Sequence, residues 1–91
     1  MQMAFSSSVI DAAWRRSGGR CECCRALCSN HGYYGCNKKL DWKARGDDNA
    51  PGGWEAHHKT AVASGGLDTL SNCEILCIAC HKKTRTYGSR R

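Results

Sequence analysis

The second half of the chain carries residues whose types suit acid–base chemistry and metal binding. His57 and His58 are adjacent, Asn72 follows a glycine pair, and His81 comes directly after Cys80. A neutral imidazole can bind a metal ion or accept a proton, and an Asn side chain both donates and accepts hydrogen bonds. On a strand, His57 and His58 point to opposite faces unless a local twist turns both towards one metal, so one can be a ligand and the other a base. Asn72 can then fix a loop or orient the base.

Two pairs of cysteines have the spacing of zinc knuckles. Cys21 and Cys24 form the first pair, and Cys77 and Cys80 form the second. Each pair can place two sulfurs at the corners of a tetrahedron, about 2.3 Å from one Zn²⁺. We therefore expect these four cysteines to bind one structural zinc, with disulfides or free thiols as the alternatives. His81 follows the second pair, so the zinc would hold the start of its helix and aim the imidazole towards the strand with the histidine pair.

The other four cysteines leave a second metal site open. Cys28, His31 and Cys36, with one further ligand such as Cys23 or Cys73, could supply a second set of donors. Free cysteine is commonly buried as a small apolar residue, so inert burial is the alternative. Cys23 could also replace either member of the first knuckle.

The length and composition of the chain favour a stabilising metal. The 91 residues, of which 41% are hydrophobic, allow a single domain, residues 1–91, with a small core. Chains of this size usually add disulfides or a structural metal. The first sixteen residues contain no apolar run long enough for a signal peptide or a membrane span. We therefore expect a cytoplasmic protein with reduced thiols, zinc rather than disulfides, and no membrane partner.

The charge of the chain suits a polyanionic partner. Fourteen Lys and Arg against eight Asp and Glu give a net charge of +6, and an excess remains after the negative charge of a four-thiolate zinc site is counted. The basic residues gather in three stretches, which suits a polyanion such as DNA, and a merely soluble basic surface is an equal alternative on charge alone. We expect Lys82, Lys83 and Arg85 to contact phosphates, a role that carries no sequence information.

Local patterns predict the elements that must position these side chains. Ser8 can cap an N-terminal helix over residues 8–16, whose apolar positions follow a period near 3.6 and which ends before the Gly18-Gly19 pair. This helix would cover the small core. Residues 20–36 are too rich in cysteine and glycine for regular structure, so we expect metal-binding turns there.

The second half predicts a strand, a loop, a strand and a helix. Residues 53–58 alternate like a strand, residues 74–76 suit a second strand, and residues 78–85 suit a short helix. The Gly- and Asp-rich segment 45–53 is expected to be a loop that joins two strands.

Taken in order, these residues resemble the HNH endonucleases of the ββα-metal (His-Me finger) fold, in the subgroup with four cysteines around the motif. The resemblance implies a small α+β zinc-stapled domain with a ββα-metal core at residues 53–86 and an N-terminal helix. It does not extend to residues 26–53, so it leaves substrate preference open. The residues that carry it are Gly19-Arg20-Cys21, Cys24, Trp54-Glu55-Ala56-His57-His58, Gly65-Gly66, Asn72, Leu76-Cys77, Cys80-His81 and Thr84.

The resemblance also implies a role for each residue of the motif. His58 would be the general base, His57 and His81 would hold a catalytic divalent cation, and Asn72 would orient the base or support the loop. The cation could be Mg²⁺, Mn²⁺, Ni²⁺, Co²⁺ or Zn²⁺. Many members have a further histidine or a Lys-Thr pair near the end of the motif, and Lys83-Thr84 meets only the second alternative. The implied activity is hydrolysis of DNA phosphodiesters, with nicking by a monomer or double-strand cleavage by a possible homodimer.

Two other kinds of protein would use the same cysteines. A non-catalytic zinc-knuckle module that binds nucleic acid would not need His57, His58 and His81 together. A zinc domain that binds other proteins would have little use for the basic excess. Taken singly, a pair of histidines on a strand is ordinarily a surface feature, and an Asn in a Gly-rich loop is ordinarily a turn former.

Overall fold

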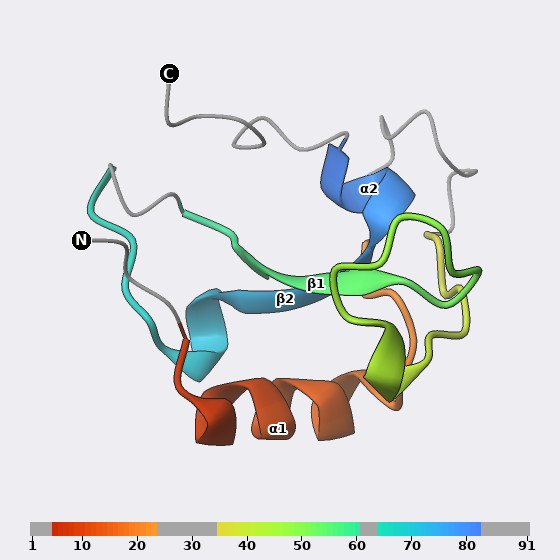
Figure 1. Cartoon of the computed structure of the whole chain (residues 1–91). Coiled ribbons are helices and arrows are strands. Elements are labelled where there is room, and N and C mark those ends of the chain that lie inside the picture. Colours follow the sequence, from red (N-terminus) through yellow and green to blue (C-terminus); the bar gives the residue numbers. More distant parts are fainter. Residues whose placement is uncertain (1–4, 24–34, 61–63, 83–91) are drawn as a thin grey trace.

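A computed structural model describes residues 5–23, 35–60 and 64–82 of the 91-residue chain. Two antiparallel strands form a small sheet, helix α1 runs beneath one face, and helix α2 rises on the other side from the end of β2 (Figure 1). The protein is thus a small α+β fold. Its elements, in order, are α1 (Ser7–Ser17), the 3₁₀ turn η1 (Trp42–Ala44), β1 (Trp54–His58), the 3₁₀ turn η3 (Leu70–Asn72), β2 (Cys73–Cys77) and α2 (Ile78–Lys82).

Helix α1 begins earlier than expected from the sequence. The N-cap is Ser6, whose hydroxyl accepts a hydrogen bond from the Val9 N–H, so the assignment of the cap to Ser8 was wrong. Phe5 and Ile10 stand at the two positions that can form a hydrophobic staple around an N-cap at Ser6, and both belong to the buried core. Burial therefore selects among three consecutive serines, each of which has a suitable side chain.

The two strands pair in a register that separates the histidines. Trp54 lies opposite Cys77 and His58 lies opposite Cys73. Successive side chains alternate, so Trp54 and His58 share one face, while His57 lies on the other. Trp54 packs against Trp14 of α1 with ring centroids 4.7 Å apart, which identifies its face as the one that α1 covers. His57 therefore faces the side of α2.

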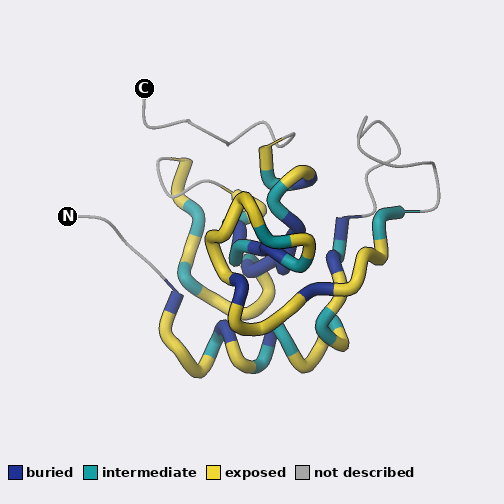
Figure 2. Tube along the Cα trace, turned by 45° about the vertical axis from the view of Figure 1, so that its right-hand side comes forward, coloured by how far each residue is buried: buried dark blue, intermediate teal, exposed yellow. Residues whose placement is uncertain are grey.

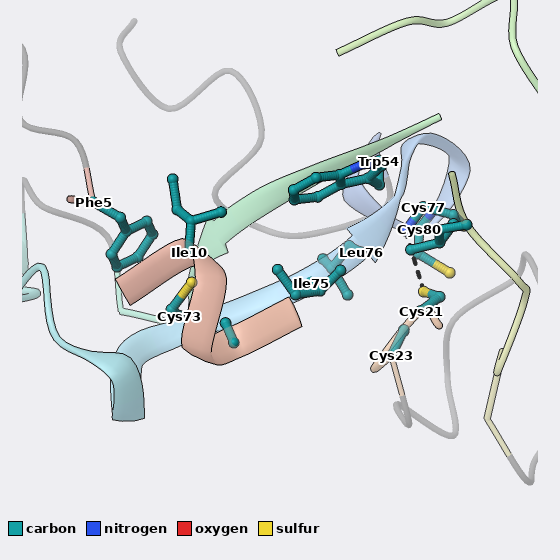
Figure 3. Packing of buried hydrophobic residues seen from close by; sticks show 12 residues of the cluster. Phe5, Ile10, Cys21, Cys23, Trp54, Cys73, Ile75, Leu76, Cys77 and Cys80 are labelled. Carbon is teal, nitrogen blue, oxygen red and sulfur yellow. Dashed lines mark hydrogen bonds between the residues drawn. The ribbon is translucent and has the colours of Figure 1, made fainter. Parts of the chain in front are cut away.

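Burial is concentrated in the sheet and beneath it. All five residues of β2 are buried, and Figure 2 shows the buried trace at the centre of an exposed periphery. In the close view of Figure 3, Phe5 and Ile10 lie towards one end of the sheet, and the labelled cysteines of the knuckles lie towards the other. Trp54, only 1% exposed, lies between them. The indole N–H of Trp54 donates to the carbonyl of Asp41 at 2.9 Å, which ties η1 to the sheet.

The loop before β1 differs from the prediction in what it connects. It joins η1, rather than a strand, to β1, because the Asp41 carboxylate caps a 3₁₀ turn by accepting from the Lys43 N–H at 3.1 Å. Between residues 35 and 53 the structure has no strand, and the only β-pairing there consists of two isolated bridges, Arg20 with Lys39 and Arg45 with Trp54. The expected strand ahead of this loop was therefore wrong.

Other expected elements fall partly outside the described residues. The helix expected at 78–85 is seen as α2 up to Lys82, and most of the metal-binding turns expected at 20–36 lie outside. In the part of the chain that the structure describes, no helix has the length and apolar character needed to span a membrane.

Candidate functional site

Four cysteines meet where β2 runs into α2. The sulfurs of Cys21, Cys36, Cys77 and Cys80 all lie within 4.8 Å of one another, and Cys36 Sγ is 3.9 Å from Cys77 Sγ. Four sulfurs on a tetrahedron about 2.3 Å from a central zinc would be about 3.8 Å apart. All are buried except Cys36, which is half-buried. The cluster therefore has the donor set, the size and the seclusion of a structural metal site.

Backbone amides donate hydrogen bonds to two sulfurs of this cluster. The Cys77 N–H donates to Cys21 Sγ at 3.2 Å (Figure 3), and the Cys80 N–H donates to Cys77 Sγ at 3.4 Å. The pKa of Cys77 falls to about 4, chiefly because the Cys21 thiol donates a hydrogen bond to it and also because the Cys80 amide does so. The pKa of Cys21 is raised in turn by that bond and by burial. Metal ligation needs thiolates, so a site that readily loses a proton suits a cation.

The fourth sulfur comes from a residue that the spacing did not assign to this site. Cys36 belongs to the described cluster, and Cys24, the expected partner of Cys21, lies outside the described residues. Cys36 reaches it because its segment runs antiparallel to the first knuckle, with the Cys36 N–H donating to the Cys23 carbonyl at 2.9 Å. Gly35, which precedes Cys36, has φ +98°, a conformation that favours glycine.

The residues considered for a second metal site do not all remain available for one. Cys36 belongs to the cluster just described, and Cys28 and His31 lie outside the described residues. Cys23 and Cys73 are buried in the hydrophobic core. Burial raises the pKa of Cys73 to about 11, so this thiol stays protonated near neutrality. Cys73 thus behaves as the small apolar residue of the alternative interpretation.

His57 and His81 are brought together from two elements. Their rings meet edge to face with centroids 5.3 Å apart, His57 from β1 and His81 from α2. His57 is 5% exposed and lies opposite the buried Glu74 of β2. Burial lowers the pKa of His81, and the nearby Glu55 carboxylate opposes this only in part. A His81 ring that stays neutral can coordinate a cation.

His58 has different surroundings from its neighbour. Its Nε2 lies 2.6 Å from Asp68 Oδ1, and its ring stacks on Phe5 with centroids 3.9 Å apart. Both His58 and Asp68 are largely but not fully covered. The two histidines of the pair therefore have separate partners, as strand alternation requires. No spacing or motif in the sequence predicts that Asp68 or Phe5 contacts His58.

Asn72 closes the connection between the two strands. Its side-chain oxygen accepts from the Thr60 N–H at 2.8 Å, and its amide donates to the carbonyls of Thr60 and Leu67. Its own carbonyl also accepts from the Lys59 N–H. Asn72 was expected either to orient the base or to support the loop, and these hydrogen bonds serve the second role. The loop they hold is the one that carries Asp68.

Of the three basic residues expected to contact phosphate, only Lys82 is described. It is exposed, and its ammonium lies 3.3 Å from Asp48 Oδ2. Such an exposed pair is weak and can open when a phosphate competes for the lysine. Lys83 and Arg85 lie outside the described residues.

A comparison with protein-family models found no match, and a comparison with curated proteins found none either.

Proposed function

We propose that this protein is a metal-dependent DNA endonuclease of the HNH type. In this proposal His57 and His81 hold one divalent cation, His58 is the general base, and the four-cysteine cluster holds a structural zinc. The cation would neutralise charge on the phosphate and stabilise the leaving oxygen. Exposed basic residues such as Lys82 would bind the phosphates on either side of the scissile bond.

The observation that carries the proposal is the pairing of His57 with His81. Two imidazoles bound to one ion at about 2.1 Å, at angles between octahedral and tetrahedral, would have ring centres about 5 Å apart. The observed separation is 5.3 Å. The pair joins β1 to α2, and the cysteine cluster holds the end of β2 and the body of α2 in place. The order of elements, β1, β2 and α2, is the order that a ββα-metal core requires.

The position of β1 supports a shared site for His57 and His58. Among the described residues β1 pairs only with β2, apart from one bridge at Trp54, so its other edge is open at the histidine end. A phosphate lying along that edge can be approached from both faces of the sheet. A cation on His57 and a base at His58 can then act on the same phosphorus from different sides.

Cleavage of supercoiled plasmid DNA tests the proposal. Purified protein should convert it to open-circular or linear DNA when Mg²⁺, Mn²⁺, Ni²⁺, Co²⁺ or Zn²⁺ is added, and not in the presence of EDTA. His58→Ala should lower the rate by about 10² to 10⁴-fold and leave DNA affinity nearly unchanged, since a positioned general base contributes that much to the chemical step. His81→Ala removes a ligand, so a higher concentration of the divalent cation should restore part of its activity but none of that lost in His58→Ala.

The matched control is Ser71→Ala, an exposed change in the same loop region. It should cleave like the wild type. If DNA is bound but not cut with any of these ions, the protein is a zinc-knuckle binding module instead. If His58→Ala and His81→Ala both cut at the wild-type rate, the activity belongs to a contaminant and the proposal fails.

A further inference from the structure

His58 is held on two sides by side chains from distant parts of the chain. Asp68 approaches the Nε2 edge of the ring at 2.6 Å, and Phe5 covers one face at an interplanar angle of 17°. A hydrogen bond in the ring plane and a stack on the ring face together restrict rotation about both side-chain torsions of a histidine. With side-chain exposures of 18% for His58 and 22% for Asp68, their bond is partly shielded from competing water.

The loop that carries Asp68 is held in place independently of His58. Gly65, at φ +89°, turns the chain in a conformation that favours glycine. Asn72 then binds the Leu67 carbonyl at 2.9 Å and both backbone groups of Thr60. Thr60, two residues after His58, and Leu67, immediately before Asp68, are thus fastened to one side chain. The carboxylate is therefore presented to the ring by the backbone and does not depend on a flexible side chain alone.

A carboxylate partner decides which nitrogen of a neutral imidazole carries the proton. An ionised carboxylate only accepts hydrogen bonds, so Nε2 of His58 must be the donor and Nδ1 must carry the lone pair. A base takes its proton through a lone pair. The one atom of this ring that can accept a proton from water is therefore Nδ1.

We propose that Asp68 is a positioning residue for the general base: it holds the proton of His58 on Nε2, fixes the ring together with Phe5, and leaves Nδ1 to act on water. The inference rests on the proposed nuclease function. In the step it serves, Nδ1 takes one proton from water, and the oxygen so released forms a bond to phosphorus. The bond from phosphorus to the leaving 3′ oxygen breaks, and that oxygen keeps the electron pair and takes a proton from water.

Nuclear magnetic resonance of protein with ¹⁵N-labelled histidine tests the tautomer without reference to activity. In the wild type the His58 signals should show a protonated Nε2, with a downfield proton that exchanges slowly with solvent, and an unprotonated Nδ1. Asp68→Ala should abolish the slowly exchanging proton. Asp11→Ala is the matched control, because Asp11 also makes one ion pair but is exposed on α1 and is not a partner of His58, so it should leave the His58 signals unchanged. A wild-type His58 with its proton on Nδ1 would overturn the proposal.

Plasmid cleavage by the same variants tests the catalytic consequence. Asp68→Ala should lower kcat by about 10²-fold, the cost of misplacing a reacting group by about 1 Å, with little change in KM for DNA. Asp68→Asn keeps the side-chain volume but adds an amide that can donate to Nε2, so kcat should fall here too if Asp68→Ala folds poorly. Zinc content and circular dichroism verify folding.

The outcomes separate this inference from the proposed function. If the wild type cuts DNA and a folded Asp68→Ala cuts equally fast, Asp68 does not position the base, although the nuclease assignment stands. If the wild type does not cut DNA under any divalent ion, both fail, even where the spectra show the expected tautomer. Loss of kcat together with loss of the Nε2 proton supports the inference.

Discussion

Replacing Cys36 by alanine should weaken zinc binding by removing one of four thiolates. Structural zinc sites bind with about 10–16 kcal/mol, so an equal share for each ligand is about 2.5–4 kcal/mol. That share corresponds to a loss of affinity of about 10² to 10³-fold. We expect Cys36 to contribute an equal share of the zinc-binding free energy, because its sulfur lies 3.9 Å from Cys77 Sγ. This distance is close to the edge length of a tetrahedron of sulfurs around zinc.

The loss of zinc affinity in Cys36→Ala should come from the missing sulfur and not from a displaced backbone. The Cys36 N–H still donates to the Cys23 carbonyl after the change, so the segment keeps its anchor. Cys73→Ala is the matched control, because Cys73 is fully buried but lies outside the cluster. It should cost some stability through lost packing and leave zinc affinity as in the wild type.

Competition with a chromophoric chelator, on reduced protein at fixed pH, measures the affinities. Cys24→Ala belongs in the same series, because the Cys-x2-Cys spacing pairs Cys24 with Cys21. If Cys36→Ala binds zinc like the wild type while Cys24→Ala has lost the site, the reasoning from sulfur distances is refuted. Cys24 is then the fourth ligand.

Three further predictions test other parts of the structure. Arg16→Ala should lower the free energy of unfolding by about 1.5–3 kcal/mol in a urea titration, because its guanidinium binds one carboxylate and two backbone carbonyls. Arg15→Ala, which removes only an exposed ion pair, should cost about 0.5 kcal/mol or less. Gly53→Ala should abolish cooperative thermal unfolding, since a Cβ there would overlap the backbone oxygen of Asp47. Gly18→Ala, which meets open space at φ +66°, should cost only about 1–2 kcal/mol. Lys82→Ala should reduce DNA affinity equally for all sequences and lower the slope of log affinity against log salt by about 1, as fluorescence anisotropy would show; a loss confined to one sequence would contradict a phosphate contact.

Elements specified by nearby residues were predictable, and contacts between distant segments were not. The alternation at Trp54–His58 and the apolar residues Ile75 and Leu76 locate two strands, which the structure pairs antiparallel. The cap of α1 required knowledge of burial, because Ser6 and Ser8 are equally good caps by type. Only the buried positions of Phe5 and Ile10 distinguish them.

In the site, too, features set by nearby residues were predictable from the sequence and contacts between distant segments were not. A Cys-x2-Cys pair such as Cys77 and Cys80 converges within one turn of chain, so its spacing is informative by itself. Cys36 joins Cys21 through an antiparallel contact, with the Cys21 N–H bound to the Lys38 carbonyl, and no spacing rule encodes that pairing. Asp68 contacts His58 through a loop that Asn72 holds closed, so the contact depends on the fold, and the residues next to Asp68 in sequence do not predict it.

The junction between β2 and α2 couples two equilibria. Cys77 ends the strand, and Cys80 and His81 are neighbours in the helix, so an ion bound to the cysteine cluster would fix the direction in which the His81 ring leaves the helix. An ion at a thousand times its dissociation constant favours the folded junction by about 4 kcal/mol. By mass action, the fraction of molecules in which His81 meets His57 would then rise and fall with the free concentration of an ion that touches neither ring. Zinc supply would set how many copies of this protein hold an assembled histidine pair.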